Sequence, residues 1–309
     1  MEKRGKGISA GWIILIIFLA VIVLCFVSCT ILLFSGEKEK SLGGNVALIQ
    51  IKGTIAVEKS SMFGAEGTSS TEIISFLKDA DRDSSIKAVV LEINSGGGSA
   101  VASKEIADAV KRLSKPSYAV IREIGASGAY WIASACDRII ANEMSITGSV
   151  GVLSSYLQFS GLLETYNISY ERLVAGKYKD MGSPLKNLTF DERAILQEKI
   201  GKIHTAFVNE VAKNRNLSYD AVQRISSAEF YLGTEALELG LVDALGDMDS
   251  AEGIIQSDLN LTKVEFSEYK KPKGLIELLS GVFAENSFYV GRGIGSMLFD
   301  AKNQFGIFT

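Results

Sequence analysis

The stretch KAVVLEIN at residues 87–94, followed by SGGG at residues 95–98, decides the fold of this chain. An unbroken run of valine, leucine and isoleucine is typical of a strand that is covered on both faces, as strands in parallel sheets are. The glycines that follow predict a tight turn in which the backbone can approach a partner closely. The stretch therefore predicts a buried parallel strand that ends in a glycine turn.

The same order of strand, turn and helix recurs on both sides of this stretch. Further strands are predicted at VALIQI (46–51), YAVIREI (118–124) and DRIIA (137–141). Helices are predicted over 71–80, over the segment that carries Ile106, Val110 and Leu113 and ends at Pro116, and over AYWIASACD, which follows the turn at Gly125. This alternation predicts an α/β fold with a mostly parallel sheet. Functional sites in such folds gather at the carboxyl ends of the strands, where both glycine-containing turns fall.

Residues 12–34 form an apolar segment without a charged side chain. A helix of this length rises roughly 34 Å, which is enough to cross a hydrocarbon core of about 30 Å. Three basic residues and one acidic residue precede it, so the positive-inside rule places the N-terminus in the cytoplasm and the rest of the chain outside it. We therefore expect a single-pass membrane anchor. The alternative is a cleaved signal peptide, whose apolar region is normally shorter.

Charge and cysteine content exclude several classes of protein. The 32 basic residues are balanced by 36 acidic residues, so nothing indicates a nucleic-acid partner. Cys25 and Cys29 lie inside the apolar segment and leave Cys136 as the only cysteine of the remainder. That remainder can form no internal disulfide and offers no thiolate metal site, so we expect Cys136 to be a small buried side chain.

Ser127 lies in GASGA (125–129), which is close to the Gly-x-Ser-x-Gly pattern of a nucleophile elbow. Small neighbours permit a tight turn from strand to helix, and the helix directs free N–H groups at an anion that forms there. The alternative is an ordinary turn with a helix-capping serine. The turn at 96–98 favours the elbow, because its glycine amides can reach an oxyanion. A phosphate-binding loop is disfavoured because no Gly-x-x-x-x-Gly-Lys-Ser/Thr pattern occurs.

A nucleophilic serine needs a base, and the chain has one histidine, His204. His204 lies on a helix that a Thr-x-x-Glu capping box opens at Thr189 and that runs to about Asn214. The apolar stripe of this helix consists of Leu196, Ile200, Ile203, Phe207 and Val211. His204 lies at the edge of the stripe, which favours a structural role. A neutral lysine is the other candidate base, but spacing and composition do not select one.

Motifs spread along the chain together resemble the signal peptide peptidase A family, membrane-bound Ser/Lys peptidases related to Clp protease and crotonase. These motifs are INSGGG (93–98), ASGAYW (126–131), TGSVGV (147–152), GKYKD (176–180) and GLVD (240–243). The match runs from the anchor to about Gly246. The family usually has proline before its glycine pair, and this chain has Gly96 there, which leaves the identity of the oxyanion amide open.

The resemblance implies a Clp protease/crotonase-like α/β fold with repeated ββα units, preceded by one transmembrane helix. It implies that Ser127 is the nucleophile, that Lys179 is the general base and that Ser149 orients the lysine. Amides near Gly98 and Gly128 would form the oxyanion hole, and no cofactor or metal would be needed. The family assembles into ring- or dome-shaped homo-oligomers, and in its short form the lysine of one protomer serves the serine of a neighbour.

Two alternatives stay open on the residues themselves. Lys177 competes with Lys179, and if 177–180 is extended both lysines share a face while Asp180 points to the other. Only the motif favours Lys179. Ser149 can equally be an ordinary turn residue in Thr-Gly-Ser.

The function implied by the resemblance is a serine endopeptidase that hydrolyses remnant signal peptides and other short apolar peptides on the extracytoplasmic side of the membrane. The expected layout is a cytoplasmic N-terminus (1–11), a transmembrane helix (12–34), a linker (35–44), the peptidase domain (45–265) and a C-terminal extension (266–309). We expect a short strand, a basic patch at Lys270, Lys271 and Lys273, and an apolar helix in the extension. The alternatives are a crotonase-type acyl-CoA enzyme and an inactive membrane-tethered scaffold.

Overall fold

The computed structural model describes residue 11 and residues 18–26, 43–58 and 67–270. The unit formed by Lys40–Tyr269 holds the sheet and all the predicted site residues. Of the predicted membrane segment 12–34, only residues 18–26 are described, and they are helical. No helix within the described residues combines the length and apolar character needed to cross a membrane. The predicted basic patch and apolar helix of the C-terminal extension lie outside the described residues, apart from Lys270.

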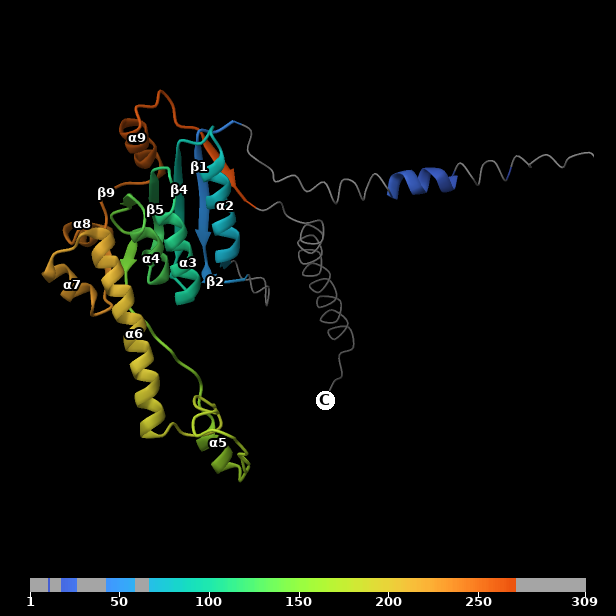
Figure 1. Cartoon of the computed structure of the whole chain (residues 1–309), viewed down its shortest axis with the longest axis vertical. Coiled ribbons are helices and arrows are strands. Elements are labelled where there is room, and N and C mark those ends of the chain that lie inside the picture. Colours follow the sequence, from blue (N-terminus) through green and yellow to red (C-terminus); the bar gives the residue numbers. More distant parts are fainter. Residues whose placement is uncertain (1–10, 12–17, 27–42, 59–66, 271–309) are drawn as a thin grey trace, which may run out of the picture. The chain divides into compact units, whose positions relative to one another are not determined.

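The main sheet is parallel along its whole principal path, as the sequence predicts. Its strands, in spatial order, are β10 (Phe266–Tyr269), β1 (Val46–Lys52), β4 (Ala88–Ser95), β5 (Ser117–Ala126), β6 (Arg138–Ala141) and β9 (Ala244–Leu245). Figure 1 shows β1, β4 and β5 side by side, with helices against them. The stretch quoted at the outset is β4, which pairs with β1 on one side and β5 on the other.

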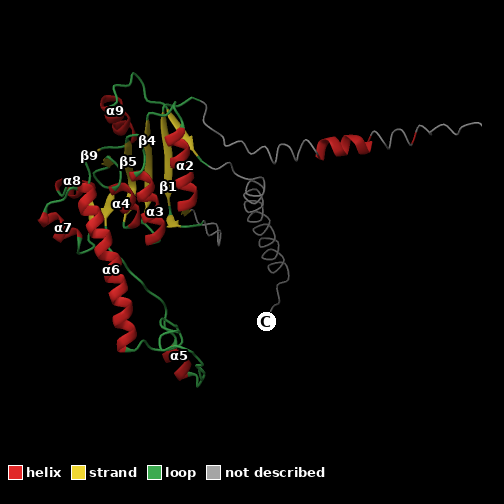
Figure 2. Cartoon of the chain, viewed as in Figure 1, coloured by secondary structure: helices red, strands yellow, loops and turns green. Residues whose placement is uncertain are grey.

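Successive side chains of β4 enter two different cores, which explains its continuous apolar sequence. Val89, Leu91 and Ile93 pack with the helices α2 (Ser70–Arg82), α3 (Ala100–Lys111) and α4 (Gly128–Ser134). Ala88 and Val90 pack on the other face, where α9 (Met248–Asp258) contributes Ala251 and Ile255. The sheet is thus covered on both faces, and Figure 2 shows its strands among these helices.

A short branch of the sheet grows from the carboxyl end of β5. β7 (Ile146–Gly148) pairs in parallel with the end of β5, and β8 (Phe230–Leu232) pairs antiparallel with β7. A separate pair is formed by β2 (Thr54–Ala56) and β3 (Gly67–Ser69).

Residues 217–246 form two short strands as well as two helices. They contain α7 (Tyr219–Ile225), β8, α8 (Gly233–Glu238) and β9. The two strands span three and two residues, so neither is long enough to show an alternating pattern.

The helix α6 (Phe190–Arg215) begins at the predicted capping box on Thr189. Its C-terminal half packs on the domain, where Phe207 stacks on Trp131 with ring centroids 4.3 Å apart. The predicted stripe is wrong for the N-terminal half, since Ile203 is 39% exposed and only Phe207 and Val211 of the stripe are fully buried. Figure 1 shows the reason: this half extends away from the sheet toward α5 (Ser160–Thr165).

Candidate active site

Ser127 lies where β5 passes into α4, in the geometry that the sequence predicts for a nucleophile elbow. Its φ of 54° and ψ of −126° are unusual for a residue with a side chain. Its backbone N–H donates to Gly148 O at 2.8 Å. Although Ser127 precedes the helix, its side chain makes no capping hydrogen bond. The capping alternative is therefore not what the structure shows.

Ser149 and Ser127 follow the ends of two paired parallel strands, β7 and β5. The pairing of β5 with β7 sets Ala126 against Gly148, so the next residue of each strand is a serine. Ser149 also has a positive φ, of 50°. Its N–H donates to Glu229 O at 2.8 Å, and none of the hydrogen bonds among the described residues uses its hydroxyl. The structure thus brings the two serines together at one edge of the sheet.

The glycine turn after β4 packs directly against this elbow. A Cβ atom on Gly97 would lie 2.7 Å from Gly128 N and 3.0 Å from Ser127 Cβ, which is too close for any side chain. Gly97 also has a φ of 97°, in the left-handed region that favours glycine. This position therefore requires glycine for two independent reasons.

The amide of Gly98 is directed away from its neighbouring strand. Gly98 forms a parallel bridge with Ile55, in which Ile55 N donates to Gly97 O at 3.0 Å and Ser99 N donates to Ile55 O at 2.8 Å. Because Ile55 bonds only the two residues that flank Gly98, the N–H of Gly98 faces the other side.

The amide of Gly128 lies close to that of Gly98. A Cβ on Gly128 would be 3.4 Å from Gly98 N. Gly128 is the first residue of α4, so its N–H has no partner within the helix. No hydrogen bond of either N–H is found among the described residues, so two backbone donors lie near Ser127, where the resemblance implies an oxyanion hole.

Ser95 supports the glycine turn and was not singled out by the sequence analysis. Its hydroxyl donates to Gly53 O at 2.5 Å and accepts from Gly97 N at 3.1 Å, and the residue is buried. A serine at the last position of a strand, directly before glycines, is a known turn-forming pattern, and this was the available signal.

The segment that carries both candidate lysines is not extended. Residues 177–182 form successive turns, in which Lys179 N donates to Gly176 O at 3.2 Å and Met181 N donates to Tyr178 O at 3.2 Å. The shared-face arrangement considered for Lys177 and Lys179 therefore does not exist.

Lys177 and Lys179 differ in what they bind. Lys177 Nζ donates to Asp191 at 2.8 Å and lies 4.9 Å from the centre of the Tyr178 ring. The hydrogen bond to Asp191 raises the pKa of Lys177 above its usual value, so this lysine is held in its charged form. Lys179 is exposed, and no hydrogen bond or ion pair of its ammonium is found among the described residues.

Lys179 is the one predicted site residue that the structure does not bring to the others. It lies in the arm segment, which we define as residues 153–189, between β7 and α6. Figure 1 shows α5 and the connection from α5 to α6 at the end of α6 remote from the sheet. Ser127 and Ser149 lie at the sheet itself, so one chain does not place its own lysine beside its own serine.

His204 and Cys136 have structural roles, as the sequence predicts. His204 Nε2 lies 3.1 Å from Val150 O and therefore donates its proton to this carbonyl. Cys136 is buried, and burial raises the pKa of its thiol above the usual value. These contacts favour structural roles for both side chains.

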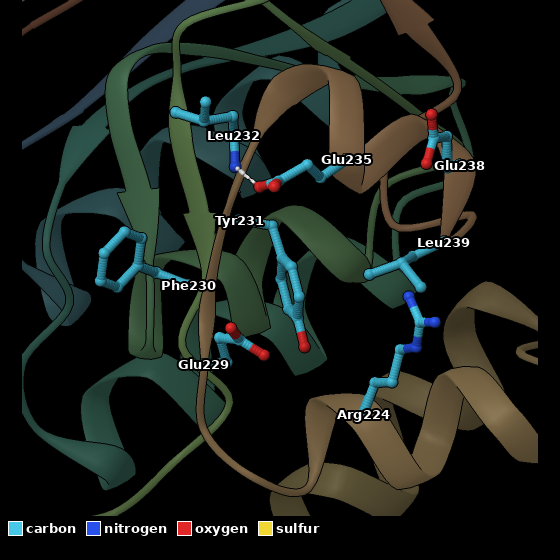
Figure 3. A pocket seen from close by; sticks show the side chains of 8 residues that line it. All are labelled: Arg224, Glu229, Phe230, Tyr231, Leu232, Glu235, Glu238 and Leu239. Atoms are coloured by element: carbon cyan, nitrogen blue, oxygen red, sulfur yellow. Dashed lines mark hydrogen bonds between the residues drawn. The ribbon is translucent and has the colours of Figure 1, made fainter.

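A pocket of about 610 Å³ is lined by residues of α7, β8 and α8 and by their neighbours, and none of the predicted site residues lines it. Its lining comes from Arg224, Glu229, Phe230, Tyr231, Leu232, Glu235, Glu238 and Leu239. Figure 3 shows the Tyr231 ring at its centre and the hydrogen bond from Leu232 N to Glu235. Among the described residues, no group of three or more His, Cys, Asp or Glu side chains could hold a metal ion.

Comparison with known proteins identifies a peptidase family. Residues 109–262 match peptidase family S49. "Putative protease MJ0651" of Methanocaldococcus jannaschii is 32% identical over 297 residues, which cover 93% of this chain and 94% of the relative. "Putative signal peptide peptidase SppA" of Enterococcus faecium is 34% identical over 237 residues, which cover 75% of this chain and 69% of the relative.

Among solved structures, the membrane-bound stomatin-specific protease 1510-N shares the fold. It superposes with a TM-score of 0.51 at 16% sequence identity and covers 75% of this chain and 100% of the other. At this identity the likeness concerns the fold alone.

Proposed function

Because this chain belongs to the signal peptide peptidase A family of serine peptidases, within peptidase family S49, we propose that it is an endopeptidase with Ser127 as nucleophile and Lys179 as general base. The observation that carries the proposal is the elbow at Ser127: in the part of the chain that the structure describes, its hydroxyl makes no hydrogen bond, and the amides of Gly98 and Gly128, which have no partner there, lie near it. We extend the proposal to the fold, which we take to be Clp protease/crotonase-like.

The proposed reaction proceeds through an acyl-enzyme. The Oγ of Ser127 attacks the peptide carbonyl carbon while its proton passes to the neutral amine of Lys179. The amides of Gly98 and Gly128 donate to the oxyanion of the tetrahedral intermediate. The C–N bond then breaks, and Lys179 returns the proton to the departing amine. Water hydrolyses the ester by the same steps, with Lys179 again as the base.

The lysine would come from a neighbouring protomer in a homo-oligomer. Within one chain the arm segment is remote from Ser127, and it carries large apolar side chains that are exposed. The most exposed of them are Leu153, Leu157, Tyr166 and Leu173. Exposed apolar surface of this kind marks an interaction site. A second copy of the chain would cover it and receive Lys179.

The substrates would be remnant signal peptides and other short apolar peptides. The predicted N-terminal helix would hold the catalytic domain at the extracytoplasmic membrane surface, near peptides that remain in the bilayer after protein export. This part of the proposal rests on the family and on the apolar sequence of residues 12–34.

Mixing two inactive variants tests the proposal. The full chain in detergent is expected to cleave an apolar reporter peptide, whereas Ser127→Ala and Lys179→Ala are each expected to be inactive. If the lysine acts across the interface, dissociating the two variants and reassembling them together restores activity. In mixed oligomers, the intact Ser127 of a Lys179→Ala protomer can meet the intact Lys179 of a Ser127→Ala neighbour. Activity of either variant alone would contradict the assignment, and failure of well-mixed oligomers to regain activity would contradict catalysis between protomers. If both variants cleave the peptide as fast as the parent, the chain is an inactive scaffold and the activity comes from a contaminating peptidase.

A further inference from the structure

A network of four charged side chains, three from the arm segment and one from the first turn of α6, includes Asp180, the residue after Lys179. Arg172 forms two hydrogen bonds with Asp180, one of them from Nη2 to Oδ1 at 2.7 Å. Lys186 Nζ lies 3.3 Å from Asp180 Oδ1 and 2.5 Å from Glu192 Oε1. Glu192 Oε2 accepts from the N–H of Thr189 at 2.9 Å, as part of the capping box that starts α6.

These charges are shielded, although most of the surrounding segment is exposed. Glu192 is 2% exposed, and the side chains of Asp180 and Lys186 are 12% and 19% exposed. The hydrogen bond from Arg172 lowers the pKa of Asp180 below its usual range, and the bond from Lys186 lowers that of Glu192. All four groups are therefore charged at neutral pH, and the chain Arg–Asp–Lys–Glu has no net charge.

The position of Asp180 gives this network a consequence for catalysis. Asp180 directly follows Lys179, and an uncompensated carboxylate beside a lysine stabilises the charged form of the amine. A general base must be neutral before it can accept a proton. Arg172 and Lys186 place two positive charges against the carboxylate of Asp180.

Two further charged groups near this turn are paired with one another. Lys177 and Asp191 bind one another, and the ring of Tyr178 lies under Lys177. Tyr170 lies near Arg172. Asp180 is thus the carboxylate that follows Lys179 directly in the sequence, and it is paired with Arg172 and Lys186.

We propose that Arg172 and Lys186 are positioning residues for Lys179: through Asp180 they hold the lysine-bearing turn and neutralise the carboxylate next to the base. This inference rests on the proposed role of Lys179. It adds to that role a set of residues which act through Asp180 and do not touch the substrate.

The test follows the rate of covalent labelling of Ser127 by a fluorophosphonate probe as a function of pH, on the full chain. In the parent protein the rate rises with pH as the base loses its proton. In Arg172→Gln we expect the pH of half-maximal rate to move upward by about half to one pH unit. This is the shift that one nearby charge typically causes when it is partly exposed to solvent. Lys186→Gln is expected to move it in the same direction.

A double variant separates charge from scaffolding. Arg172→Gln/Asp180→Asn removes the uncompensated carboxylate together with its partner, so the pH of half-maximal rate is expected to return toward the parent value. The matched control is Lys202→Gln, which breaks an exposed ion pair with Glu198 elsewhere on α6 and is expected to leave the profile unchanged. Circular dichroism and size-exclusion chromatography on every variant identify any that fail to fold or assemble.

The outcomes distinguish this inference from the function on which it rests. If Lys179→Ala labels as fast as the parent with the same pH profile, the proposed base is wrong. If Lys179→Ala is not labelled but Arg172→Gln loses rate equally at all pH values, the network has only a structural role and the inference is overturned. An upward shift that the second substitution does not reverse would overturn it as well.

Discussion

The N–H of Ser127 donates to the carbonyl of Gly148 at 2.8 Å, and this bond ties the elbow to the strand that ends at Ser149. Both serines then leave their strands with positive φ, 54° at Ser127 and 50° at Ser149. Two residues in a sparsely populated conformation, side by side, are typical of a functional site, because the surrounding structure must hold them there.

The conformation of Ser127 predicts how its variants rank in stability. Glycine can adopt the positive φ of this position without strain, whereas alanine is strained there as serine is. We expect the glycine variant to be more stable than the alanine variant by about 1 kcal/mol, with both inactive. Urea denaturation of the two variants measures the difference. Equal stability would mean that the elbow is not strained.

Gly97→Ala is expected to abolish most of the activity. The added Cβ would lie 2.7 Å from Gly128 N and must displace an amide of the proposed oxyanion hole. Removal of one such donor costs about 3–4 kcal/mol in the transition state, a loss on the order of 100-fold or more in kcat. Gly253→Ala in α9 is the control, since nothing lies within 4 Å of its added Cβ. A Gly97→Ala enzyme with normal kcat would contradict the placement of the oxyanion hole.

Lys177→Gln and Lys179→Gln form a matched pair two residues apart. Lys177 is bound to Asp191 and held charged, so its loss is expected to change kcat/KM by less than about threefold, as for an exposed ion pair. Loss of a general base costs about 100- to 10,000-fold, and we expect this of Lys179→Gln. Steady-state hydrolysis of a reporter peptide compares the two. The reverse ranking would assign the base to Lys177.

His204→Ala is expected to keep most of the activity and to lose stability. The imidazole donates to Val150 O, and loss of one hydrogen bond of this kind costs about 1 kcal/mol. Thermal unfolding and peptide hydrolysis on the same preparation check both parts. A large fall in kcat with unchanged stability would restore a Ser/His mechanism.

Acidification is expected to remove the contribution of Asp180 to stability. The pKa of Asp180 is lower in the folded chain than in the unfolded chain, so its ion pairs stabilise the fold above the unfolded pKa. The contribution falls as the pH drops from about 5 toward the folded pKa, since the unfolded carboxyl takes up its proton first. We therefore expect the stability difference between the parent and Asp180→Asn to be constant at neutral pH and to shrink below about pH 5. A difference that does not change with pH would show that the ion pairs are not its source.

The local order of strands, turns and helices was predictable from sequence because it depends on neighbouring residues. The apolar run of β4, the glycines after it and the small residues around Ser127 each constrain the backbone where they occur. Parallel pairing then follows from the alternation of strand and helix, and with it the meeting of both turns at one edge of the sheet. The capping box at Thr189 was visible for the same reason, since its partner is three residues away.

The tertiary structure decided what depends on contacts between distant residues. The strands β8 and β9 are set by pairing with β7 and β6, and the direction of the Gly98 amide is set by its bridge to Ile55. The fully buried apolar residues of α6 lie only in its C-terminal half, and this depends on where the sheet ends, which the helical periodicity of the sequence does not indicate. The sequence by itself predicted Ser127 as the candidate nucleophile, and the family motif favoured Lys179 as its base. Only the tertiary structure shows that Lys179 lies far from Ser127 within one chain, because this separation is set by the path of the backbone. Likewise, only the tertiary structure shows the ion pairs of Asp180 with Arg172 and Lys186, because these pairs join residues from different turns.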